Sequence, residues 1–199
     1  DGGIARFRVF GTAVPDPRWL AALGTVNLAG IDIGADLVEC SDDFYSSARN
    51  TLQPGNALNQ GDGWENRRRR GGGNDYFTVR LGLEGTITAI DVDTQHFKGN
   101  PPGWIKVSAS ASGNAGDFFD VVAKSAVLPD GSHRYLVEAD NPVRFVRLDV
   151  YPDGGLGRFR VWGRPTSTAL AHHSTAWLDS AGPGFTPSDL NLVQRLAGG

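Results

Sequence analysis

Hydrophobic and polar residues alternate along much of the chain, in short runs separated by turn-forming residues. In the first long run, Phe77, Val79 and Leu81 are each followed by a polar or small residue. A period of two is typical of a β-strand with one buried face. The pattern predicts strands at residues 36–40, 76–82, 86–93, 104–110, 118–123, 133–138, 144–151 and 157–163.

This series of short strands, with no amphipathic helix between them, favours an all-β fold. Antiparallel β-sandwiches have this pattern, and eight strands suit a jelly roll. The 27 glycines are about twice the average share, as expected for a chain with many tight turns. The adjacent strands 76–82 and 86–93 are predicted to form a hairpin, which would return Asp93 to the level of Asp75.

A phrase near the start of the chain recurs near its end. Residues 1–11 read DGGIARFRVFG and residues 153–163 read DGGLGRFRVWG, with eight identical positions. Asp-Gly-Gly predicts a tight turn, and the alternation after it predicts a strand. A spacing of 152 residues is that of a whole domain, because solenoid repeats are only about 20–50 residues long.

The repeat therefore suggests a division of the chain. We expect residues 1–11 to be the closing strand of a missing first repeat and 12–25 to be a linker with a short helical turn. Residues 26–163 are expected to form the jelly-roll domain. The remainder, 164–199, is expected to be an extension of unassigned structure and role.

Composition narrows the function classes. The formal net charge of −3 argues against a nucleic-acid partner. Apolar runs of about 18 residues, which a membrane helix needs, do not occur. The single cysteine, Cys40, is interpreted as a small buried apolar residue. The sequence contains no Asn-X-Ser/Thr site, which favours a cytoplasmic protein.

The stretch 62–70, DGWENRRRR, concentrates polar chemistry in one predicted loop. Its arginines could bind a small anion through bidentate contacts, and its carboxylates could transfer a proton. The alternative is a solvated charged loop with an aromatic residue at the edge of the core.

A second polar stretch follows the strand 86–93. Asp93 and His96 could form an acid/base pair or half of a metal site, or could lie in an ordinary surface turn. Adjacent acids in 41–50 could bind Ca²⁺ or simply cap a turn. No complete set of metal ligands is recognised in either stretch, so no metal and no cofactor are expected.

Taken together, these stretches resemble the allantoicase family, enzymes that cleave allantoate to ureidoglycolate and urea. The matching phrases follow the family's order and are SDDFYSSARNTLQPG at 41–55, DGWENRRRR at 62–70, NDYFTVRLG at 74–82, DVDTQHFKGNPP at 91–102 and YPDGGLGRFRVWG at 151–163. The resemblance implies two tandem jelly rolls of the galactose-binding-like type. It also implies a hydrolase of purine catabolism that packs on the first repeat and self-associates. The chain departs from the family at Asn66, where Thr is common, and at Tyr76, where Trp is common.

The resemblance also implies a substrate site in the loops. The carboxylate of allantoate would be bound by Arg68 with help from Arg67. Asp62 would bind ureido N–H groups, and Asn100 would add a polar contact. Trp64 would form an apolar wall that excludes water.

Three residues are implied to be catalytic. Asp93 and His96 would form the acid/base pair, and Glu65, counted with them, would bind ureido N–H groups. Two alternatives remain open: a non-catalytic galactose-binding-like module that binds a small ligand, and a structural repeat whose twin carries the chemistry.

Overall fold

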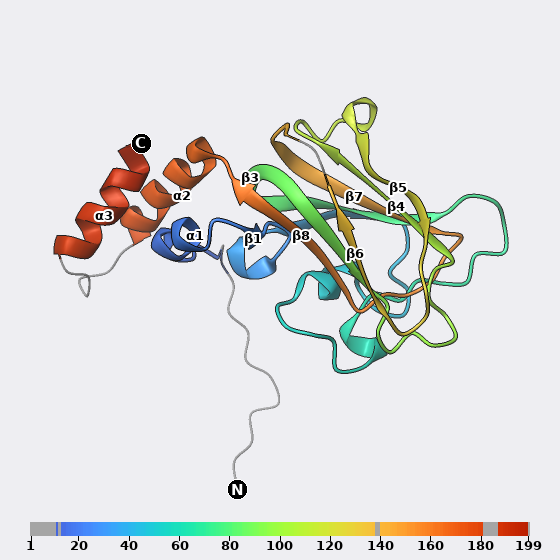
Figure 1. Ribbon diagram of the computed structural model, residues 1–199. Coiled ribbons are helices and arrows are strands. Elements are labelled where there is room, and N and C mark those ends of the chain that lie inside the picture. The colour runs from blue at the N-terminus through green and yellow to red at the C-terminus, as the bar shows by residue number, and fades with distance from the viewer. Residues whose placement is uncertain (1–10, 12, 138–139, 181–186, 199) are drawn as a thin grey trace, which may run out of the picture.

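The computed structural model describes residues 11, 13–137, 140–180 and 187–198 (Figure 1). The predicted closing strand at 1–11 lies outside the described residues apart from Gly11, as does the last residue of the strand predicted at 133–138. The strands are β1 (Val26–Asn27), β2 (Asp36–Cys40), β3 (Asp75–Asp93), β4 (Trp104–Ser110), β5 (Phe119–Ala126), β6 (Ser132–Leu136), β7 (Val143–Tyr151) and β8 (Arg158–Pro165). The α-helices are α1 (Pro17–Leu23), α2 (Ser167–Ser180) and α3 (Pro187–Gly198).

The strands form an antiparallel β-sandwich whose two layers share β3. The first half of β3 lies between β2 and β7, and the sheet continues through β4 to β5. The second half lies between β6 and β8, and β8 pairs with the short β1. Every strand pairing in the described residues is antiparallel, as expected for a jelly roll.

Strand β3 bends sharply between its two halves (Figure 1). Asp75 at its start pairs with Val150 in β7, and Asp93 at its end pairs with Arg158 in β8. Because residues 152–157 join β7 directly to β8, both ends of β3 lie at the same end of the sandwich. The predicted hairpin is therefore wrong, since a continuous bent strand replaces it. The predicted return of Asp93 to the level of Asp75 is confirmed.

Two glycines allow this bend. A Cβ atom at Gly82 would lie 2.3 Å from the carbonyl oxygen of Ile33, and one at Gly85 would lie 2.4 Å from that of Arg164. Neither position has room for a side chain, because backbone from a neighbouring segment passes directly against it.

The core lies between the two layers and continues under the loops. Phe77 packs edge-on against Trp64 at 5.1 Å and against Phe159 at 5.5 Å between ring centroids. All three rings are fully buried. One aromatic residue from each layer and one from the loop region are thus held in a single cluster.

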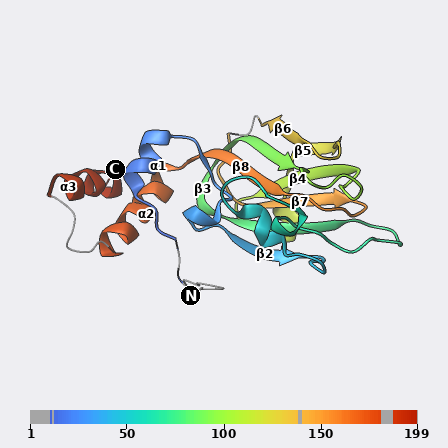
Figure 2. The same ribbon diagram turned by 90° about the horizontal axis from the view of Figure 1, so that it is seen from below.

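The helices gather at the end of the sandwich where β3 bends (Figures 1 and 2). Helix α1 confirms the predicted helical turn in the linker, with the Asp16 carboxylate accepting from the Arg18 N–H as an N-cap. Helices α2 and α3 lie in the stretch that the sequence pattern left unassigned. Among the described helices, none is long and apolar enough to cross a membrane.

The bend yields a stability prediction. Gly82→Ala places a methyl group against the Ile33 carbonyl, so we expect a loss of about 1–3 kcal/mol, or roughly 2–12 °C in Tm. Thermal unfolding followed by circular dichroism measures this loss. Gly116→Ala is the matched control, since a Cβ there meets nothing within 4 Å. Equal Tm values for the two variants would show that the bend does not depend on close backbone contact.

Candidate functional site

Three loops meet at the end of the sandwich opposite the helices. We refer to residues 62–74 as the arginine loop, to 94–103 as the β3–β4 loop and to 152–157 as the β7–β8 loop. The arginine loop leads into the start of β3, and the β3–β4 loop follows its end. The β7–β8 loop joins the two strands that pair with these ends of β3. The bend in β3 therefore brings them together.

Backbone hydrogen bonds join these loops. Trp64 in the arginine loop and Leu156 in the β7–β8 loop exchange N–H to carbonyl bonds of 2.9 and 3.0 Å. The Gly155 N–H donates to the Asn100 carbonyl at 2.9 Å, which joins the β3–β4 loop to the β7–β8 loop. The predicted convergence of the arginine loop with the β3–β4 loop is confirmed.

The Asp-Gly-Gly phrase of the β7–β8 loop fits tightly into this junction. Gly154 has a φ of 130°, and a Cβ there would lie 2.3 Å from the Pro102 nitrogen. A Cβ at Gly155 would lie 2.0 Å from the Phe97 ring. Gly154 thus confirms the positive φ expected of the phrase, whereas Gly155 is required by close packing.

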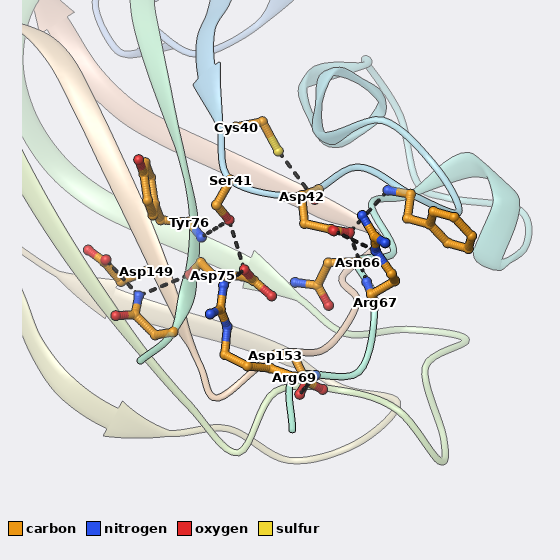
Figure 3. A network of polar contacts seen from close by, with 12 residues as sticks. Cys40, Ser41, Asp42, Asn66, Arg67, Arg69, Asp75, Tyr76, Asp149 and Asp153 are labelled. Atoms are coloured by element: carbon orange, nitrogen blue, oxygen red, sulfur yellow. Dashed lines mark hydrogen bonds and ion pairs between the residues drawn. The ribbon is translucent and has the colours of Figure 1, made fainter. Parts of the chain in front are cut away.

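The arginines of the run 67–70 differ in their ion-pair partners (Figure 3). Arg67 pairs with Asp42 through Nε at 2.9 Å and lies over the Phe44 ring. Arg69 pairs with the buried Asp75. In the described residues Arg68 has no ion pair or hydrogen bond from its side chain, and it is exposed. The arginines therefore neither all point freely into solvent nor all remain available to bind an anion.

The Arg69 network fixes the arginine loop to the sheet (Figure 3). The Asp75 carboxylate also accepts from the Ser41 hydroxyl at 3.0 Å, and the Arg69 N–H donates to Asp153 Oδ2 at 2.6 Å. The hydrogen bond to Asp75 raises the pKa of Arg69 above its ordinary value, so this side chain stays charged. Its neighbour Arg68 thus extends from an anchored backbone.

Arg68 borders a cleft of about 530 Å³, a volume typical of small-molecule sites. Glu65 and Asn100 line the same cleft and are joined by a hydrogen bond of 2.7 Å from Asn100 Nδ2 to Glu65 Oε1. The other lining residues are Tyr45, Asn66, Arg69, Gly99, Pro101, Pro152, Asp153, Gly154 and Gly155. Three of the residues expected in the site therefore lie together.

Asn66 is a buried part of the cleft wall, with 5% of its surface exposed. Its Oδ1 accepts from the Gly154 N–H at 2.8 Å. Its Nδ2 has no hydrogen-bond partner in the described residues. The Asn66 side chain thus holds the β7–β8 loop against the arginine loop.

Trp64 and Asp62 lie away from this cleft. Trp64, expected as an apolar wall, is fully buried and donates from Nε1 to the Asp42 carbonyl at 2.8 Å. Asp62 accepts from the Leu58 N–H and borders a separate hollow beside Arg158. Trp64 therefore supports the arginine loop from within the core.

Asp93 and His96 have local partners. Buried Asp93 accepts from the Gln95 N–H at 2.8 Å. The His96 ring nitrogen Nε2 lies 2.9 Å from the Ala57 carbonyl. Within the described residues no hydrogen bond joins Asp93 to His96, and neither borders the cleft. Their assignment as an acid/base pair stays a prediction.

The sequence did not reveal a buried arginine at the base of the loops. Arg158 is 4% exposed, and its guanidinium donates to the carbonyls of Asn50, Gly55, Asn56, Asp62 and Gly157 at 2.7–3.4 Å. Burial lowers its pKa. Since its acceptors are all backbone carbonyls from loops, no sequence motif signals the arrangement.

A second hollow, about 490 Å³, lies over the sheet formed by β2, β3, β7, β4 and β5. Four of its five charged groups form ion pairs, Lys106 with Asp120 at 3.1 Å and Arg147 with Asp149 at 2.9 Å, and the fifth, Glu39, accepts from the Tyr76 hydroxyl at 2.7 Å. The cleft at the loops is different because Arg68 on its rim is unpaired. The loop cleft is therefore the stronger candidate for a ligand site.

The family profile of the allantoicase repeat matches residues 26–166. The chain belongs to the allantoicase family. A probable allantoicase from Streptomyces avermitilis is 41% identical over 182 residues, which are 92% of this chain and 48% of that protein. The chain spans about half the length of the curated relatives it matches.

Solved structures agree with this assignment. The crystal structure of allantoicase from Saccharomyces cerevisiae superposes with a TM-score of 0.66 at 38% identity, over 70% of this chain and 43% of that one. A family 32 carbohydrate-binding module from Streptococcus pneumoniae has a TM-score of 0.53 at 9% identity, over 70% of this chain and 100% of the module. The second likeness concerns the fold alone.

The Asp42–Arg67 contact predicts an acid dependence. Burial opposes ionisation of Asp42, but hydrogen bonds from Arg67 and Phe44 outweigh it and lower the pKa of the carboxyl. This stabilisation is present above the ordinary pKa near 4 and is lost as pH falls through the lower folded value. We expect Asp42→Asn to flatten the acid decline of Tm, measured from about pH 6 to 3.

Asp43→Asn is the control for this measurement, because Asp43 is an exposed neighbour without a hydrogen bond in the described residues. An acid decline that is identical in wild type, Asp42→Asn and Asp43→Asn would contradict the prediction.

Proposed function

We propose that the protein to which this repeat belongs hydrolyses allantoate to ureidoglycolate and urea, and that the loop cleft binds the substrate. The observation that carries the proposal is the unpaired Arg68 beside Glu65 on one cleft. Family membership and the names of the relatives support the same reaction.

The cleft matches the substrate in charge. Allantoate carries one carboxylate and two ureido groups on a single carbon. Arg68 offers a planar fork of N–H donors, which suits a carboxylate and allows two parallel hydrogen bonds. Because Arg67 and Arg69 are already paired with Asp42 and Asp75, Arg68 is the arginine available to the ligand.

Proton transfer is assigned to Glu65. The reaction breaks one carbon–nitrogen bond and forms one carbon–oxygen bond, so a proton must leave water and reach the departing urea nitrogen. Glu65 Oε1 is held by Asn100, and Oε2 has no partner in the described residues. A carboxylate oriented in this way can accept the proton from water and return it to nitrogen.

The partner and compartment follow as further parts of the proposal. We infer that the repeat packs against a second repeat of its kind, that the protein self-associates and that it acts in the cytoplasm. The duplicated phrase at 1–11 and 153–163 supports a second repeat. Analytical ultracentrifugation of the full-length protein tests self-association.

Arg68→Ala tests the carboxylate contact. A charge-assisted hydrogen bond contributes about 1.5–3 kcal/mol, so we expect kcat/KM for urea release by the full-length protein to fall roughly 10- to 150-fold. Most of the loss should appear in KM, because the carboxylate is bound in the ground state and the transition state alike. Arg68→Lys should recover only part of the loss.

Arg70→Ala is the matched control, since Arg70 is also exposed but does not border the cleft. Equal effects of Arg68→Ala and Arg70→Ala on KM would show that the run acts only through its overall charge.

Glu65→Gln tests proton transfer. The amide oxygen of Gln can still accept from Asn100, but the side chain no longer takes up a proton. We therefore expect kcat to fall about 10²–10⁴-fold with little change in KM. If His96→Ala lowers kcat by this amount and Glu65→Gln does not, the acid/base role belongs to the pair predicted from the sequence.

A further inference from the structure

Asp153 places a second carboxylate on the same cleft as Glu65, again with only one of its two oxygens hydrogen-bonded in the described residues. Its Oδ2 accepts from the Arg69 N–H at 2.6 Å, and its Oδ1 has no partner in the described residues. Figure 3 shows the carboxylate against the Arg69 backbone. It lies in the Asp-Gly-Gly phrase, which the sequence pattern explains only as a turn.

The position of this carboxylate is fixed by its loop. Gly154, the next residue, donates its N–H to Asn66 and has no room for a Cβ. The Gly155 N–H is bound to the Asn100 carbonyl at 2.9 Å. Asp153 is therefore held between the arginine loop and the β3–β4 loop, and its free oxygen is preorganised for a ligand.

Other acids near the arginine run are not available in this way. Both oxygens of Asp42 accept from Arg67. Asp75 is buried, is paired with Arg69 and does not border the cleft. Glu65 and Asp153 are the carboxylates among the described cleft-lining residues, and each keeps one oxygen free.

We propose that Asp153 is a specificity-determining residue for ureido groups: its free oxygen accepts an N–H from the terminal NH₂ of a ureido group of the substrate. A ureido group offers N–H donors where an acyl group offers only a methyl group. A site with an acceptor fixed at that position favours the ureido compound, because the acyl analogue leaves the carboxylate unpaired. This inference rests on the proposed function, since it assigns a role within the allantoate site.

The test compares two ligands that differ by one group. Ureidoacetate and N-acetylglycine share the carboxylate, and the terminal NH₂ of the first is a methyl group in the second. Isothermal titration of the full-length protein should give wild type a preference for ureidoacetate of about 10- to 100-fold. Asp153→Asn keeps an oxygen for the Arg69 N–H but presents an NH₂ donor instead of the free oxygen. Its preference should fall to within about twofold.

Arg68→Ala is the matched control, because it should weaken both ligands by a similar factor and keep the preference. Asp153→Asn with the wild-type preference would overturn the proposal. So would a wild type that binds both ligands equally or binds neither, a result that does not depend on the folding of any variant. Thermal unfolding of Asp153→Asn should give a Tm within a few degrees of wild type, since the bond to Arg69 is kept.

The same samples separate this inference from the proposed function. Wild type that prefers ureidoacetate but releases no urea from allantoate as the full-length protein would leave Asp153 as a ureido-binding residue and refute the enzymatic assignment. Urea release together with an unchanged preference in Asp153→Asn would keep the enzyme and refute the role of Asp153.

Discussion

The structure depends on one strand that belongs to both layers of the sandwich. Strand β3 hydrogen-bonds to β2 and β7 through its first half and to β6 and β8 through its second half. Its bend needs Gly82 and Gly85, where the backbone of other segments takes the space of a side chain. Because the bend returns Asp93 to the level of Asp75, the loops that form the candidate site start from neighbouring points.

Ion pairs determine which charged side chains of the loops remain available to bind a ligand. Asp42 and Asp75 neutralise Arg67 and Arg69, so that Arg68 keeps its full hydrogen-bonding capacity toward the cleft. Arg158 supports the site differently, because its buried guanidinium donates hydrogen bonds to backbone carbonyls between residues 50 and 62. Buried groups hold the loops in place, and the exposed groups between them remain available for a ligand.

Most strands could be predicted from the sequence, because alternation with a period of two directly reflects one buried face. The two-residue β1 was not predicted, and β3 was predicted as two strands. The bend could not be predicted, since glycines at 82 and 85 fit a turn equally well. Helix α2 was missed because its buried positions include Ser174 as well as Trp177, which gives a weak apolar stripe. Arg68 could be predicted as a site residue, but the distinction between it and Arg69 depends on partners that only the fold supplies.

The same bent strand has a consequence for how the chain folds. Its two halves pair with segments that lie about 70 residues further along, from Val143 to Pro165. A chain must close these long loops before the pairing contributes any stabilising contacts, and such non-local topologies fold in roughly milliseconds to seconds. The cleft needs both halves of the strand in place, so it cannot form until these long-range pairings have closed.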